Sequence, residues 1–101
     1  MWIMVMFDLP TDTKKARRRY SLFRKSLLED GFLQMQYSVY ARPCPTDENA
    51  HVHRRRVEGA IPVEGHVRIL LFTDKQFERM LVFNGKIRDY PERQPEQMAF
   101  F

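Results

Sequence analysis

The chain opens with a run of apolar residues that ends at a single carboxylate. Residues 2–7 (WIMVMF) are all apolar, and Asp8, Leu9 and Pro10 follow. An uninterrupted apolar run of this length is typical of a strand that is buried on both faces. Because Pro10 has no backbone N–H to donate and fixes its own φ, we expect the strand to end by Leu9. The sequence therefore predicts that Asp8 lies at the end of a central strand.

Two interpretations of Asp8 follow from the sequence. A carboxylate at the end of a rigid strand can bind a hard cation such as Mg²⁺ or Mn²⁺. An Asp in this position is also common as a turn or helix-capping residue. One carboxylate makes a poor Mg²⁺ site, but a two-fold dimer would supply a second copy of it. The sequence thus makes Asp8 the candidate catalytic and metal-binding residue and leaves its capping role open.

The segment that follows Pro10 is strongly basic. Seven Lys and Arg residues and no acidic residue lie between positions 14 and 25. A helix with this composition lacks internal ion pairs and carries like-charge repulsion, which a bound polyanion would relieve. A solvated charged face or an acidic protein partner would account for the same pattern. The residues that we predict to contact nucleic acid are Lys14, Lys15, Arg17, Arg18, Arg19 and Lys25.

Hydrophobic periodicity and turn residues predict the remaining elements. A helix that starts after Thr13 and ends near Asp30 has an apolar stripe at i, i+4, i+7 and i+11, formed by Ala16, Tyr20, Phe23 and Leu27. In residues 32–42 (FLQMQYSVYAR) apolar and polar residues alternate, which predicts one strand with an apolar and a polar face. Later elements are a helix over 47–59, strands over 67–72 and 80–83, a turn at Asn84–Gly85, a polar linker over 86–97 and an apolar end at 98–101.

The two faces of the predicted strand over 32–42 have different expected neighbours. Leu33, Met35, Tyr37 and Val39 share the apolar face, where Tyr37 fits a core position. Gln34, Gln36, Ser38 and Tyr40 share the polar face, which is left for solvent or a partner.

The order of elements predicts an α+β fold. Strands and helices in this order form a split-βαβ, ferredoxin-like sandwich of βαββαβ type, with an antiparallel sheet and both helices on one face. We expect residues 1–85 to form this domain. Residues 86–101 are then an extended C-terminal linker and a terminal strand, which docks on its own sheet or on that of a second protomer.

Composition excludes several classes of site and protein. The lone cysteine, Cys44, rules out an intramolecular disulfide framework and is consistent with the cytoplasm. His51 and His53 are two residues apart and do not share a helical face, so no zinc constellation is predicted. No apolar stretch is long enough to cross a bilayer, so we expect no membrane association. The net charge of +4 comes entirely from residues 1–60, which favours a polyanionic partner.

Three segments together resemble a known family. They are MVMFDLPTDT around Asp8, FRKSLLEDGFLQMQYSVYAR over residues 23–42, and ILLFTDKQFERMLVFNG over residues 69–85. The chain is similar over nearly its whole length to the small CRISPR-associated endoribonucleases, the CRISPR-associated protein 2 family, in a form like that of type II systems. Many members carry Tyr directly before the Asp, where this chain has Phe7.

The resemblance implies a role in CRISPR adaptation, the acquisition of spacers. It implies a ferredoxin-like homodimer in which the two Asp8 residues hold a divalent metal, Mg²⁺ or Mn²⁺, at the interface. The dimer would bridge subunits of the CRISPR integrase, CRISPR-associated protein 1, and bind duplex DNA. It would also cleave single-stranded RNA or double-stranded DNA with the metal. The alternative is a purely structural, non-catalytic adaptor of the integrase complex, which needs the basic surface and not Asp8.

Overall fold

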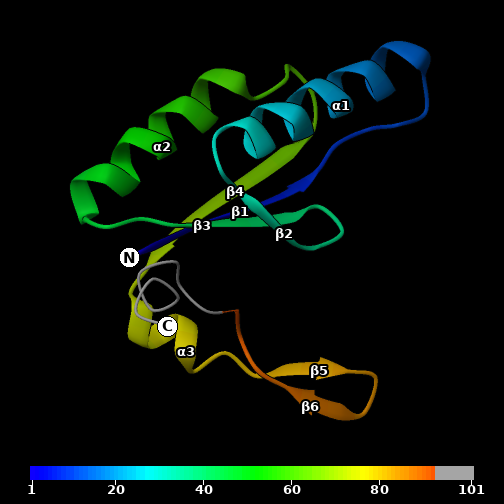
Figure 1. Cartoon of the computed structure of the whole chain (residues 1–101). Coiled ribbons are helices and arrows are strands. Elements are labelled where there is room, and N and C mark those ends of the chain that lie inside the picture. The colour runs from blue at the N-terminus through cyan, green and yellow to red at the C-terminus, as the bar shows by residue number, and fades with distance from the viewer. Residues whose placement is uncertain (93–101) are drawn as a thin grey trace.

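The computed structural model describes residues 1–92. Its elements follow one another along the chain (Figure 1) as β1 (Trp2–Asp8), α1 (Lys14–Glu29), β2 (Leu33–Gln36), β3 (Val39–Pro43), α2 (Asp47–Ala60), β4 (His66–Phe72), α3 (Asp74–Glu78), β5 (Val82–Asn84) and β6 (Ile87–Asp89). The predicted docking of residues 98–101 lies outside the described residues, and the division of the chain at residue 85 stays a prediction.

The main sheet has four antiparallel strands in the order β2-β3-β1-β4. β1 lies in the interior of this sheet, with Val5 opposite Tyr40 of β3 and Ile69 of β4. Both long helices cover the same face of the sheet (Figure 1). The order of strands and helices is that of the ferredoxin-like sandwich, so the predicted fold class is confirmed.

Alternation along β1 divides its side chains between the two faces. Ile3, Val5 and Phe7 are buried on the helical face, where they form one core with residues of both long helices. From α1 this core receives the predicted stripe residues Phe23 and Leu27. The helix begins where the sequence predicts, because the Thr13 hydroxyl accepts a hydrogen bond from the Ala16 N–H at 3.0 Å.

Within the described part of the chain, residues 1–92, the opposite face of the sheet is covered at one end only, by the short helix α3. Trp2 is fully buried there, and its ring stacks on Phe77 of α3 with centroids 3.8 Å apart. Met4 and Met6 follow on the same face and are half-buried. We call this surface the open face. The expectation that the apolar run is buried on both faces therefore holds at Trp2 but not along the rest of β1.

The prediction of one strand over 32–42 was wrong. The chain turns at Tyr37 and Ser38, so that β2 and β3 pair with each other as a hairpin. Ser38 adopts a φ of 61°, and the register shifts between Gln34 and Gln36. Simple alternation cannot be followed through such a turn, because it changes which face each later residue occupies.

The assignment of faces in this segment was wrong for the same reason. Tyr40, expected on a polar face, is fully buried in the core beneath the helices. Tyr37, expected at a core position, has 78% of its surface exposed. The open face is instead apolar, with Met35 packed beside Met4.

Among the described residues, β5 and β6 pair only with each other, as a hairpin that projects away from the main sheet (Figure 1). The predicted turn at Asn84–Gly85 is present, and Gly85 has the positive φ of 64° that it requires. Residues 80–83 were expected to form a strand of the sandwich, but β5 belongs to this separate hairpin. The start of the predicted linker over 86–97 is also not extended coil, because Ile87–Asp89 is the second strand of the hairpin.

Candidate functional site

Asp8 is the last residue of β1 and lies on the open face. It continues the alternation of Met4 and Met6, so its side chain is on the side of the sheet away from α1 and α2. It is exposed, and no hydrogen bond or ion pair within residues 1–92 engages its carboxylate. The helix cap next along the chain is Thr13 and not Asp8. Both oxygens of this carboxylate are therefore available to a ligand.

The sheet register places a histidine opposite this carboxylate. Asp8 pairs with His66, the first residue of β4, and Met6 pairs with Arg68. Residues opposite each other in antiparallel strands share a face, with Cβ atoms about 5 Å apart. Asp8, His66 and Arg68 are all exposed. The end of the open face thus carries an acid, an imidazole and a guanidinium, of which only Asp8 was predicted as a site residue.

Gly65 fixes the backbone beneath this group. A Cβ at position 65 would lie 2.9 Å from the Asp8 carbonyl oxygen and 2.5 Å from Leu9 Cδ2, and the φ of Gly65 is +101°. Glycine alone tolerates both the close approach and this φ. The chain before β4 therefore packs directly against the backbone that positions Asp8.

The residues at this site fit a divalent metal only in part. Within residues 1–92, no cluster of three or more His, Cys, Asp or Glu side chains could enclose an ion. Mg²⁺, however, is commonly held by one or two carboxylates together with waters and substrate phosphates. One protomer supplies the single unengaged carboxylate of Asp8, and a two-fold partner would supply a second.

The predicted basic residues form an exposed surface on α1. Lys14, Lys15, Arg17, Arg18, Arg19 and Lys25 are all exposed, as is Arg24. Lys25 lies 3.8 Å from Glu29, and Arg17 donates to the Thr11 carbonyl oxygen at 3.2 Å. Because α1 covers the helical face and Asp8 lies on the open face, one protomer does not bring the basic surface and Asp8 together.

The open face has two apolar hollows. One of about 450 Å³ lies between Met4, Leu70 and Met80, and another of about 420 Å³ lies between Met6, Met35 and the start of β5. Leu70 and Leu33 are each about half exposed. Exposed apolar surface that continues across several strands is typical of a protein interface.

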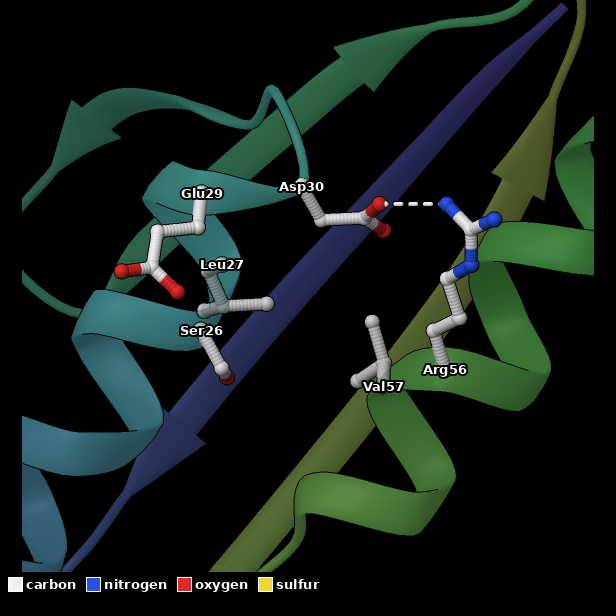
Figure 2. A pocket seen from close by; sticks show the side chains of 6 residues that line it. All are labelled: Ser26, Leu27, Glu29, Asp30, Arg56 and Val57. Atoms are coloured by element: carbon white, nitrogen blue, oxygen red, sulfur yellow. Dashed lines mark hydrogen bonds and ion pairs between the residues drawn. The ribbon is translucent and has the colours of Figure 1, made fainter.

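A separate pocket of about 250 Å³ lies between the end of α1 and α2 (Figure 2). In it Arg56 points toward Asp30 and donates to Oδ1 at 2.8 Å (Figure 2). The other oxygen of this carboxylate, Oδ2, accepts a hydrogen bond from His53 Nδ1 of α2 at 2.7 Å. Burial alone would raise the pKa of Asp30, but the hydrogen bonds from His53 and Arg56 outweigh it, so the pKa is lowered. His53 is almost fully buried, and this network joins the two helices. The carboxylate is fully engaged, which is typical of a structural ion pair.

Comparison with known proteins assigns the family. The family model for CRISPR associated protein Cas2 matches residues 1–80. The chain is 54% identical to the CRISPR-associated endoribonuclease Cas2 of Parvibaculum lavamentivorans over the full length of both chains. The chain belongs to the Cas2 family.

Other Cas2 proteins show the same relationship. The CRISPR-associated endoribonuclease Cas2 of Flavobacterium psychrophilum is 44% identical over all of this chain and 88% of its own. The crystal structure of Streptococcus pyogenes Cas2 at pH 6.5 has a TM-score of 0.62 and 22% identity, over 83% of this chain and all of that one. This likeness supports the ferredoxin-like fold of the Cas2 chain.

Sequence reasoning missed His66 and Arg68 as neighbours of Asp8. A signal was present, because an antiparallel partner of β1 must begin opposite the point where β1 ends, and His66 directly precedes the predicted strand 67–72. Cys44 is buried, and burial raises the pKa of its thiol. Within residues 1–92, no helix has the length and hydropathy to span a bilayer.

Proposed function

We propose that the protein acts in CRISPR adaptation as a homodimer with metal-dependent endonuclease activity centred on the two Asp8 residues. The observation that carries this proposal is the exposed, unengaged carboxylate at the end of an apolar sheet face. The names of the relatives, which are called endoribonucleases, support the reaction class. The substrate class is single-stranded RNA or double-stranded DNA.

The open face supports the homodimer. Its half-buried Met4, Met6 and Met35 form a surface that a second copy would cover. In a two-fold arrangement of facing sheets the same patch serves both protomers, so each Asp8 lies on the shared interface. Two facing carboxylates repel each other unless a cation or a proton lies between them.

Each residue of the site would have a defined role in cleavage. A bound Mg²⁺ or Mn²⁺ would neutralise negative charge on the phosphate and activate a water molecule. The Asp8 carboxylates would hold the cation. Arg68, on the same face as Asp8, is placed to contact a neighbouring phosphate, since a guanidinium matches two phosphate oxygens.

A cleavage assay tests the enzyme proposal. Single-stranded RNA and duplex DNA are incubated with the wild type and Asp8→Asn, with Mg²⁺ or Mn²⁺ titrated against chelator. We expect the wild type to cut, the chelator to stop it, and Asp8→Asn to be inactive while it remains dimeric. Asp12→Asn is the matched control, because Asp12 is exposed in the loop before α1. Equal activity of the wild type and Asp8→Asn would refute the role of Asp8.

The basic surface of α1 favours a second function, a non-catalytic adaptor that holds duplex DNA and bridges subunits of the CRISPR integrase, CRISPR-associated protein 1. Lys14, Arg18 and Arg19 are exposed on α1, which covers the face of the sheet opposite to Asp8 (Figure 1), so this role does not require cleavage. Contacts from such residues address phosphates and are independent of sequence.

Binding measurements test the adaptor. We expect Asp8→Asn to bind duplex DNA and the integrase as the wild type does. The double variant Lys14→Glu/Arg18→Glu should bind duplex DNA more weakly, with a shallower dependence of affinity on salt. Arg55→Glu, on α2, is the control for general charge effects. Unchanged DNA binding in the double variant would contradict the role of α1.

A further inference from the structure

Four aromatic rings form a ladder from the core to the surface beside α1. Tyr40 stacks on Phe7 with ring centroids 5.7 Å apart, and Phe7 packs against Tyr20 at the same distance. Tyr20 in turn stacks on Tyr37 at 6.4 Å, with an angle of 23° between the rings. Tyr40 and Phe7 are buried, whereas Tyr37 is the most exposed of the four. Tyr37 is therefore the exposed outer ring of a series of packed rings that begins in the core.

The turn that carries Tyr37 is held from both sides. Ser38 has a positive φ, which is rare outside glycine. It is the only non-glycine residue with a positive φ within residues 1–92. Its carbonyl oxygen accepts a hydrogen bond from the Phe7 N–H at 3.1 Å. Its hydroxyl lies 3.3 Å from the hydroxyl of Tyr20. Backbone in a rarely populated conformation persists where surrounding contacts over-determine it, and such positions cluster at functional sites.

The surroundings of the outer ring are positively charged. Arg17 and Arg24 lie three residues before and four residues after Tyr20, so they share its side of α1. Both are exposed, and no acidic residue lies between positions 14 and 25. The Tyr20 hydroxyl raises the pKa of Tyr37 above its ordinary value of 10.0, at which the phenol is already neutral at physiological pH. The exposed ring of Tyr37 thus stacks on a residue of α1 that has Arg17 and Arg24 on its side of the helix.

We propose that Tyr37, backed by Tyr20, is a stacking platform for an unpaired base of single-stranded nucleic acid, with the phosphates of that strand following Arg17 and Arg24. This inference rests on the nucleic-acid binding proposed above and names a site for one substrate class. Exposed aromatic rings beside a basic track are the general device for binding single strands without sequence preference. Within a duplex each base is covered on both faces by its neighbours, so the platform selects unpaired strands.

Fluorescence anisotropy of labelled oligonucleotides, measured in chelator so that nothing is cut, tests the platform. The probes are a short oligouridine, a fully abasic oligonucleotide of the same length, and a blunt-ended duplex DNA without loops. We expect Tyr37→Ala to weaken binding of the oligouridine about 5- to 100-fold, as loss of one stacked base does. Duplex binding should stay within about twofold, and Tyr37→Phe should bind as the wild type does.

Two controls make the result specific. The abasic oligonucleotide should bind the wild type as weakly as the oligouridine binds Tyr37→Ala, because both lack the stacking pair. Tyr90→Ala removes a tyrosine of similar exposure beyond β6 and should change nothing.

Unchanged oligouridine binding by Tyr37→Ala would overturn the platform. Equal losses of affinity for the single strand and the duplex, or loss of the dimer in Tyr37→Ala, would overturn it too. If the wild type binds the duplex and the platform test fails, the proposed function stands. If the wild type bound none of the probes, both the stacking platform and the proposed function would be refuted.

Discussion

Asp8 and His66 lie opposite each other at the paired end of β1 and β4, on the face of the sheet that the helices leave uncovered. No ion pair joins the two side chains in the described protomer, and both are exposed. An imidazole beside a carboxylate alters the choice of metal, since nitrogen ligands favour Mn²⁺ over Mg²⁺ more than oxygen ligands do. The pair therefore bears on which cation the proposed site prefers.

Replacing His66 should change metal preference more than it changes the fold. We expect His66→Asn to weaken Mn²⁺ binding and to leave Mg²⁺ binding close to that of the wild type, because the imidazole is lost and the Asp8 carboxylate stays. Electron paramagnetic resonance of free Mn²⁺, with Mg²⁺ as competitor, measures both affinities. His51→Asn, on α2, is the control. Equal loss of both cations in His66→Asn would show that His66 acts on the fold and not on the metal.

Gly65→Ala should disturb the backbone at Asp8. The added Cβ would meet the Asp8 carbonyl oxygen, and alanine is strained at a φ of +101°, so we expect a loss of about 1–3 kcal/mol in the free energy of unfolding. Gly59→Ala is the matched control, because its Cβ would contact nothing within 4 Å and its helical position favours alanine by about 0.5–1 kcal/mol. Urea unfolding followed by the fluorescence of Trp2 measures both. A stable Gly65→Ala would mean that the approach to β1 is looser than described.

Asp30→Asn should destabilise the protein in a pH-dependent way. The folded pKa of Asp30 is lowered from its ordinary 3.8, so its stabilising contribution is present above about pH 4 and is lost as the pH falls through the lower folded value. At neutral pH we expect the variant to lose about 1–3 kcal/mol, because the carboxylate partner of buried His53 is gone. The difference from the wild type should shrink at pH values below the lowered folded pKa of Asp30, where the carboxyl is protonated in both states. Thermal unfolding across this range provides the measurement, and a difference independent of pH would exclude the ion pair as its source.

A charge on the open face should prevent dimerisation. Leu70→Glu places a carboxylate beside Met4 in the apolar hollow, and burying it against a second copy without a partner is strongly unfavourable. We expect the variant to sediment as a folded monomer at concentrations where the wild type is a dimer. Leu22→Glu is the control, since Leu22 is similarly exposed but lies on α1. If Leu70→Glu remains dimeric, the two copies meet through another surface.

The sequence predicted those features that depend on local periodicity. The helix after Thr13, the strand that ends at Asp8 and the Asn84–Gly85 turn were read correctly, because caps, prolines and turn residues act within a few positions. The hairpin at Ser38 was missed, because no glycine or proline marks a turn that is held by contacts with Phe7 and Tyr20. That turn also decides which face Tyr37 and Tyr40 occupy, so one unseen turn reversed both assignments.

The sequence predicted the acidic residue of the candidate site, Asp8, but not the residues that surround it. The position of Asp8 follows from Pro10 and the apolar run, whereas its pairing with His66 depends on the register between strands more than fifty residues apart. Register is set by the packing of whole faces, which a single strand does not specify. The same limit applies to the pairing of Asp30 with His53, which needs the two helices to be docked first.

The stacking of Trp2 on Phe77 has a consequence for how this protein can diverge. All four strands and both long helices of the sandwich are complete by Phe72. α3 is joined to the sheet by this aromatic pair, by the stacking of Phe72 on Phe77, and by the ion pair between the Met1 ammonium group and Asp74. The hairpin beyond α3 can therefore accumulate substitutions without refolding the sandwich.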